Sequence, residues 1–176
     1  MFELPPIPAW DGLHPLIVHF PIALLLVAPL FIVLGLFAGG RHRLFMTSAL
    51  VLMVLGTAAS YVAVSTGEAA GKLADRTPEV NLVLQHHEEL AERTRLTFTV
   101  LTVVFAGLLA GPAVLRRQVA RVPTVVLTLL FLGVYSAGAV VLANTAHNGG
   151  RLVHELGVRS LMPASPIPTA AADPDD

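Results

Sequence analysis

The sequence predicts an all-α integral membrane protein: a four-helix bundle whose spans run alternately up and down, with a short outward-facing helical segment between spans 2 and 3. Its composition is 55% hydrophobic and only 13% charged, whereas a soluble domain carries about 25% charged residues. Four segments are apolar over the roughly 20 residues that a helix needs to cross a hydrocarbon core. Two of the connections between them are very short, which makes the helices that they join antiparallel neighbours.

The first two predicted spans cover residues 16–38 and 44–65. Pro15 suits the first turn of a helix, so His14 is expected to cap the N-terminus of the first span. Glycine is a poor helix former, and we expect Gly67 to interrupt the second span where it leaves the membrane. The connection between these two spans is a tight antiparallel turn.

The last two predicted spans cover residues 96–115 and 122–144. Residues 66–95 are expected to form one or two helical turns outside the membrane, then a break, and then a helix that leads into the third span. Residues 160–176 are rich in Pro, Ala and Asp and show no hydrophobic periodicity, so they are predicted to be a disordered tail. The transmembrane domain therefore comprises residues 1–159.

Small residues recur at four-residue spacing on each span, and such pairs let helices approach closely in lipid. The pairs are Gly35 with Gly39, Gly56 with Ser60, Gly107 with Gly111, and Gly133 with Ala137. We expect all four pairs to lie at contacts between helices of a compact bundle.

The distribution of arginines predicts the orientation of the bundle, because short cytoplasmic loops are rich in basic residues. The two short connections carry five arginines and no acidic residue: Arg41, Arg43, Arg116, Arg117 and Arg121. The long connection mixes basic with acidic side chains. We therefore predict that the short connections lie in the cytoplasm, and that the long connection and both termini face outward.

The charge and the cysteine content exclude several classes of protein. The formal net charge is −1 and the basic residues are scattered, so the chain lacks the basic surface that binding to nucleic acid requires. The absence of cysteine excludes disulfides, thiolate metal sites, iron–sulfur clusters and covalently attached c-type haem. Any metal or cofactor must be held by His, Glu, Asp or neutral oxygen atoms.

Histidines gather at one predicted end of the bundle. Six of the seven lie at the outward-facing end: His14, His19, His86, His87, His147 and His154. Helical spacing directs His87 and His147 toward the bundle and places His19 about one turn inside the first span. An imidazole that points into an apolar bundle needs a partner, and imidazole is both a metal ligand and a proton carrier. We therefore expect a metal, a haem or a proton at this end.

The first functional hypothesis is a membrane electron-transfer subunit that holds a b-type haem between histidines of different helices. The candidate axial ligands are His14 or His19 on one side and His87 or His147 on the other. The cations expected near the haem propionates include Arg95 and Arg151.

Two alternatives remain open. One is a non-haem zinc or iron site with nitrogen and oxygen ligands, namely His19, His87, His147 and Glu68. The other is a cofactor-free scaffold or proton-handling subunit of a respiratory complex, in which the histidines bond to one another or exchange protons.

Four stretches of the chain resemble a bacterial membrane family known as domain of unknown function 2231. They are residues 13–25, 65–70, 87–93 and 146–153, which include an opening His-Pro-x-x-x-His-Phe-Pro and a closing Gly-Gly-x-Leu-Val. The resemblance implies four spans and a respiratory or electron-transfer setting, with redox partners such as cytochrome c or Rieske proteins. Together with the arginine distribution, it leads us to expect a bacterial inner-membrane protein with both termini periplasmic, which works in an oligomer or as a subunit of a larger complex.

Overall fold

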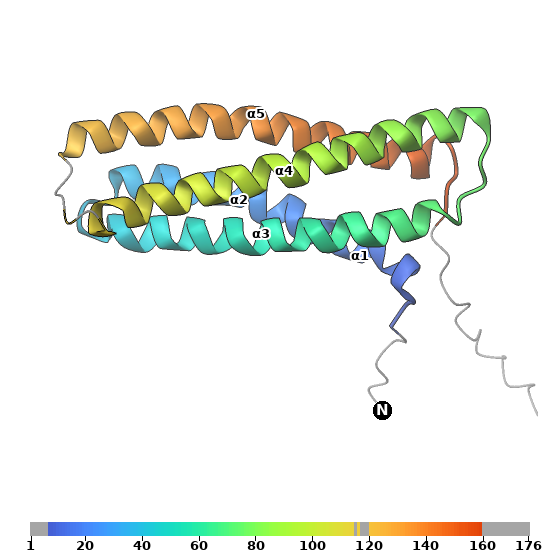
Figure 1. The fold of residues 1–176 in the computed structure, drawn as a ribbon, viewed down its shortest axis with the longest axis horizontal. Helices are drawn as coiled ribbons and strands as arrows, with labels where there is room; N and C mark the ends of the chain where they lie inside the picture. The colour runs from blue at the N-terminus through green and yellow to red at the C-terminus, as the bar shows by residue number, and fades with distance from the viewer. Residues whose placement is uncertain (1–6, 115, 117–119, 160–176) are drawn as a thin grey trace, which may run out of the picture.

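The computed structural model describes residues 7–114, 116 and 120–159, which fold as a bundle of long helices (Figure 1). The elements are η1 Trp10–Leu13, α1 His14–Ile17, α2 His19–Phe37, η2 Gly39–Arg41, α3 His42–Gly71, α4 Pro78–Val114 and α5 Arg121–His154. Four helical segments are long and apolar enough to cross a membrane, and the described residues contain no strand. The all-α, four-span prediction is confirmed, whereas the tail 160–176 lies outside the described residues.

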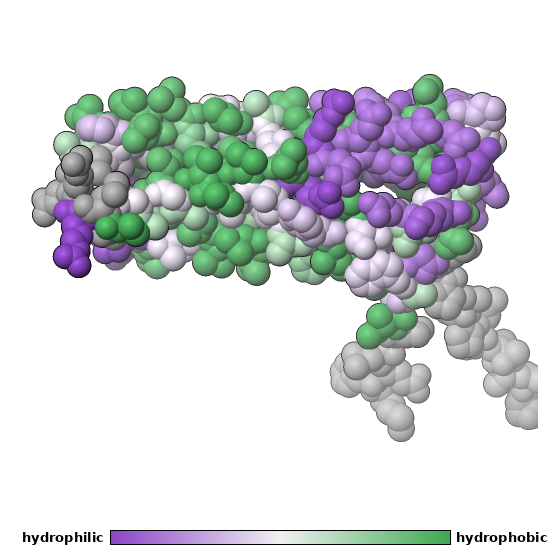
Figure 2. All heavy atoms as spheres, in the orientation of Figure 1, coloured by the Kyte–Doolittle hydropathy of each residue, from purple (hydrophilic) through white to green (hydrophobic). Residues whose placement is uncertain are grey.

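The bundle extends beyond its apolar belt at one end. Figure 2 shows polar residues gathered where α3 and α5 end and α4 begins, and apolar residues over most of the remaining length. Val83, Leu84 and Leu152 form a small buried cluster in this extension. We call it the histidine end, because it contains His14 and His87, and we call the opposite end, with Arg41 and Arg121, the arginine end.

One part of the prediction for the connection between the second and third spans is wrong: Gly67 does not interrupt α3, which continues to Gly71. The predicted break and the helix that follows it are confirmed, because α4 begins at Pro78 and runs into the third span without interruption. The small buried cluster of the extension explains this continuity, because apolar contacts between α4 and α5 stabilise the helix outside the membrane.

The first span is broken near its start, between α1 and α2 at Val18. Pro21 has no amide hydrogen to donate to the carbonyl of Ile17, and its ring crowds that carbonyl. His14 is the first residue of α1 and not its N-cap, which is Leu13. The predicted capping role of His14 is therefore wrong, and its side chain is free to reach another helix.

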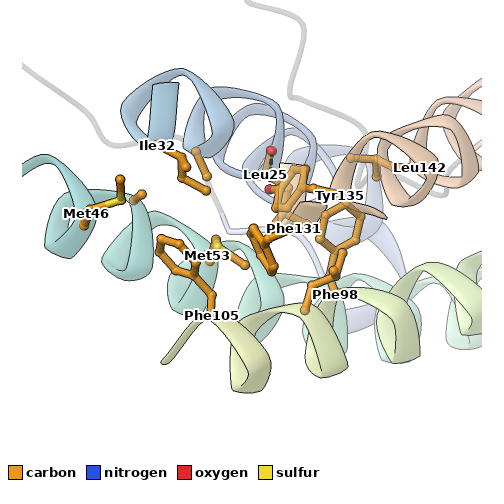
Figure 3. Packing of buried hydrophobic residues seen from close by; sticks show 12 residues of the cluster. Leu25, Ile32, Met46, Met53, Phe98, Phe105, Phe131, Tyr135 and Leu142 are labelled. Atoms are coloured by element: carbon orange, nitrogen blue, oxygen red, sulfur yellow. Dashed lines mark hydrogen bonds between the residues drawn. The ribbon is translucent and has the colours of Figure 1, made fainter. Parts of the chain in front are cut away.

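The core lies along the bundle axis and contains residues from all four long helices (Figure 3). The rings of Phe98 and Tyr135 meet edge to face at 5.3 Å, and those of Phe105 and Phe131 stack at 5.0 Å. Aromatic pairs in these arrangements add about 0.5–1.5 kcal/mol to the stabilisation from burial alone.

Only some of the small residues lie at helix contacts. Gly56 packs so closely on α2 that a Cβ atom would lie 2.8 Å from Cγ of Leu25, and Gly35 packs similarly on Met46. A Cβ atom on Gly107, Gly111 or Gly133 would meet nothing within 4 Å among the described residues. The same holds for Gly39 of the first pair. The prediction that all four pairs lie at contacts is therefore wrong for the third and fourth spans and for one member of the first pair.

One hydrogen bond joins α5 to α2 inside the core. Pro29 cannot donate to the carbonyl of Leu25, which would otherwise accept an amide hydrogen from that position. The hydroxyl of Tyr135 donates to that carbonyl at 2.6 Å (Figure 3). The bond satisfies a polar group that has no water available in the membrane core.

We expect Tyr135→Phe to lower the free energy of unfolding by about 1–3 kcal/mol, because it leaves the Leu25 carbonyl buried and unsatisfied. The effect should shrink in a Pro29→Ala background, because the substitution restores a backbone amide donor at that position. Reversible unfolding in detergent micelles measures the free energy of unfolding of the wild type, the two single variants and the double variant. An equal cost of Tyr135→Phe in both backgrounds would contradict the explanation.

Candidate functional site: a histidine pair on the bundle axis

Two histidines from different hairpins meet at the histidine end of the bundle. His14 begins α1 and His87 lies on α4, and their ring centroids are 6.4 Å apart with the ring planes at 79°. The helices in contact are α2 with α3, α3 with α4, α4 with α5, and α2 with α5, so the first and third spans lie diagonally across the bundle. The pair therefore lies near the bundle axis.

A backbone carbonyl of the neighbouring helix holds each ring. Nδ1 of His14 lies 2.9 Å from the carbonyl oxygen of Ala63 on α3, and Nδ1 of His87 lies 3.0 Å from that of Thr145 on α5. A carbonyl oxygen can only accept, so Nδ1 of each ring carries the hydrogen and donates it. In the neutral ring, Nε2 then keeps its lone pair, and no described residue forms a hydrogen bond with either Nε2.

Glycines provide the surfaces on which the rings rest. A Cβ atom on Gly67 of α3 would lie 2.8 Å from Cε1 of His14, and one on Gly149 of α5 would lie 3.0 Å from Cε1 of His87. Both distances are too short for a larger residue unless the ring moves. Each imidazole therefore lies against the backbone of the helix whose carbonyl holds it.

Neutral polar side chains surround the pair. The hydroxyl of Thr66 lies 3.3 Å from Nδ1 of His14 and donates to the backbone carbonyls of Val62 and Ala63. Next to His87, the hydroxyls of Thr94 and Thr145 are 2.8 Å apart and buried. These contacts stabilise neutral rings without placing a carboxylate beside them.

The structure turns His19 and His147 away from the bundle. Both side chains are exposed. Five helical positions separate His14 from His19 and turn the two rings to different sides of the helix, and Thr145 and Asn148 occupy the inward positions of α5. The expectation that these two imidazoles point into the bundle is wrong.

The four residues of the predicted non-haem metal site do not come together. Glu68 is exposed, like His19 and His147. Within residues 7–114, 116 and 120–159, no group of three or more His, Cys, Asp or Glu side chains is placed to hold a metal ion.

The two predicted cations already have acidic partners. Arg95 is paired with Glu92 and lies 5.0 Å from the centroid of the Tyr61 ring. Arg151 donates to Glu155 at 2.8 Å. A haem propionate would have to compete with these carboxylates.

Sequence reasoning found the two histidines but missed what holds them. The carbonyls of Ala63 and Thr145 carry no signal in the sequence, because every residue has a carbonyl. Gly67 and Gly149 follow Thr66 and Asn148, which are buried polar residues. These two dipeptides, each a polar residue followed by glycine near the outer end of an apolar segment, were the sequence signal that could have identified the glycines beneath the rings.

Residues 11–161 match the family described as "Predicted membrane protein (DUF2231)". The chain belongs to this family. The match includes all four spans, both histidines of the pair, and both glycines beneath them. No curated protein and no solved structure matches the chain.

We expect nitrogen NMR of this DUF2231 protein, labelled with ¹⁵N-histidine, to show three rings fixed with hydrogen on Nδ1 at neutral pH: His14, His87 and His42, whose Nδ1 lies 2.9 Å from the carbonyl oxygen of Gly35. The carbonyl bonds impose this tautomer, whereas exposed rings exchange between forms. His14→Asn and His87→Asn should each remove one of these signals, and His19→Asn should remove none. Hydrogen on Nε2 of His14 and His87 would disprove their carbonyl bonds.

Proposed function

We propose that this DUF2231 protein is an electron-transfer subunit that holds one b-type haem at the histidine end, with His14 and His87 as axial ligands. The observation that supports the proposal is the pair of imidazoles from opposite hairpins, each held by Nδ1 and each with an Nε2 that no described residue bonds. Histidines that ligate metals commonly donate their other ring nitrogen to a backbone carbonyl in this way, which fixes the tautomer and the ring orientation.

The separation of the rings suits a shared iron. Metal–nitrogen bonds of about 2 Å on each side of an ion, together with the radii of the rings, place two axial imidazole centroids roughly 6 Å apart. The observed centroids are 6.4 Å apart.

The number of donors favours a haem over a bare ion. Zinc in proteins takes about four ligands, at least three of them from the protein, and no such group is assembled in the described part of the chain. A haem supplies four nitrogen atoms of its own, so that two axial imidazoles complete the coordination of its iron.

The backbones beside the pair are well separated. No Cα atom of α1 lies within 8 Å of a Cα atom of α4 or α5, so that the side chain of His14 spans the distance to His87. A planar group would approach the pair from the side of α1 and α5.

The chain's own residues would position and insulate the haem. The carbonyls of Ala63 and Thr145 hold the rings, and the core around Phe98 and Tyr135 closes the site toward the membrane interior. The bound iron would supply a change of one electron. In the predicted orientation the site faces the periplasm, where a soluble carrier such as a cytochrome c or a Rieske protein would exchange electrons with it.

We expect the protein, expressed with added haem precursor and purified in detergent, to show a b-type α band in the reduced-minus-oxidised spectrum. His14→Ala and His87→Ala should lose more than ~90% of that band, because each removes one of the two axial nitrogens. His19→Ala and His147→Ala are matched controls and should retain it, because both side chains are exposed.

Metal analysis of the same samples separates the alternatives. A folded protein without haem but with zinc or iron would overturn the proposal in favour of a bare ion. A folded protein with neither would overturn it in favour of a cofactor-free histidine pair.

A further inference from the structure

The two halves of the bundle bury corresponding positions along most of the core, although Gly35 and Thr57 are buried and their counterparts Leu108 and Ala139 are only half-buried. In α2, residues 21, 25, 28 and 32 are buried, and so are residues 94, 98, 101 and 105 of α4, each 73 positions later. In α3, residues 46, 49, 53, 56, 60, 63 and 66 are buried, and so are residues 128, 131, 135, 138, 142, 145 and 148 of α5, each 82 positions later. The larger second offset arises mainly because α4 and α5 extend further beyond these positions at the arginine end than α2 and α3 do, and partly because their connection is longer.

Helical periodicity alone does not explain the repetition, because individual contacts also correspond. A Cβ atom on Gly56 would lie 2.8 Å from Leu25 and 3.2 Å from Leu24. One on Gly138 would lie 3.7 Å from Phe98 and 3.1 Å from Thr97. The same offsets relate all three pairs, Gly56 to Gly138, Leu24 to Thr97 and Leu25 to Phe98, so that both hairpins cross at the same place.

The histidine contacts follow the same offsets. His14 corresponds to His87 by 73 positions, and Ala63 and Thr145, whose carbonyls hold the two rings, correspond by 82 positions. Gly67 corresponds to Gly149, and each lies beneath the ring of its own half. The same unit therefore occurs in each hairpin. The first helix supplies the imidazole. The second helix supplies the carbonyl that holds it and, four residues later, the glycine on which it rests.

We infer that the chain consists of two copies of one helical hairpin, in which Gly67 and Gly149 are equivalent positioning residues that each seat one imidazole. Both copies begin at the histidine end, so the approximate two-fold axis that relates them runs along the bundle, as in parallel repeats of membrane proteins (Figure 1). The histidine pair lies near this axis. A ligand held there meets the same donor from both sides.

The arrangement restricts the class of ligand, and this step rests on the proposed haem function. A ligand near a two-fold axis is best matched when its two faces offer equivalent coordination positions. The iron of a haem does so, whereas a ligand with one polar end does not. The equivalence of the glycines, in contrast, requires no bound ligand.

Double variants, which combine a substitution at one glycine with a substitution at one histidine, test the inference without haem. In full-length protein in detergent, Gly67→Ala should lower the melting temperature by at least ~3 °C, because the added methyl group displaces His14. The loss should largely disappear in a His14→Ala background and persist in a His87→Ala background. Gly149→Ala should show the reverse pattern, and Gly107→Ala, whose position is open, should leave the melting temperature unlowered in either background.

The possible results are distinct. Rescue of each glycine variant only by removal of the histidine of the same half supports two equivalent seats. Rescue in one half alone, or by either histidine, overturns the equivalence. Where a glycine variant is too unstable to purify, the yields of folded protein from its two double variants, one with each histidine replaced by alanine, are judged by the same rescue pattern. Because the readout is stability, absence of haem would remove the proposed function and leave this result unchanged.

Discussion

The structure depends on satisfying polar groups where water is scarce. A backbone or side-chain polar group in a membrane bundle costs free energy unless another part of the protein bonds it. The chain meets this constraint by pairing groups across helices: Tyr135 with the carbonyl freed by Pro29, and His14 and His87 with carbonyls of α3 and α5. These bonds fix the relative positions of helices that lipid alone would not hold together.

The same constraint decides which histidines occupy the axis. Each ring is held at two points, because its Nδ1 donates to a carbonyl and the ring rests on a glycine. The orientation of Nε2 is thereby fixed. His19 and His147 have no such seat among the described residues and turn outward. Preorganised ligands of this kind favour a bound ion or cofactor, because little further ordering is needed on binding.

The sequence predicted the fold better than the site, for physical reasons. The spans follow from apolar length, which is a property of each segment, and they are confirmed. The direction of a side chain depends on the helical phase, and five helical positions turn His19 away from the side on which His14 lies. On α5 the expected inward face was displaced by one position, since Thr145 and Asn148 are buried and Asn144 and His147 are exposed. The sequence also does not distinguish Gly56 and Gly67, which lie at close contacts, from Gly107, which lies in an open position.

The approximate symmetry is broken at the seams between the hairpins. Hydroxyl bonds close the α3–α4 seam, from Thr57 to Thr102 at 2.9 Å and from Tyr61 to Thr99 at 3.1 Å. At the symmetry-related seam, between α2 and α5, the two helices contact each other at fewer positions, and α1 does not contact α5. Because α3 and α4 are also joined directly along the chain, the hairpins can separate more easily on the α5 side. For the function proposed above, this makes the α5 side the direction from which a planar ligand would approach both histidines.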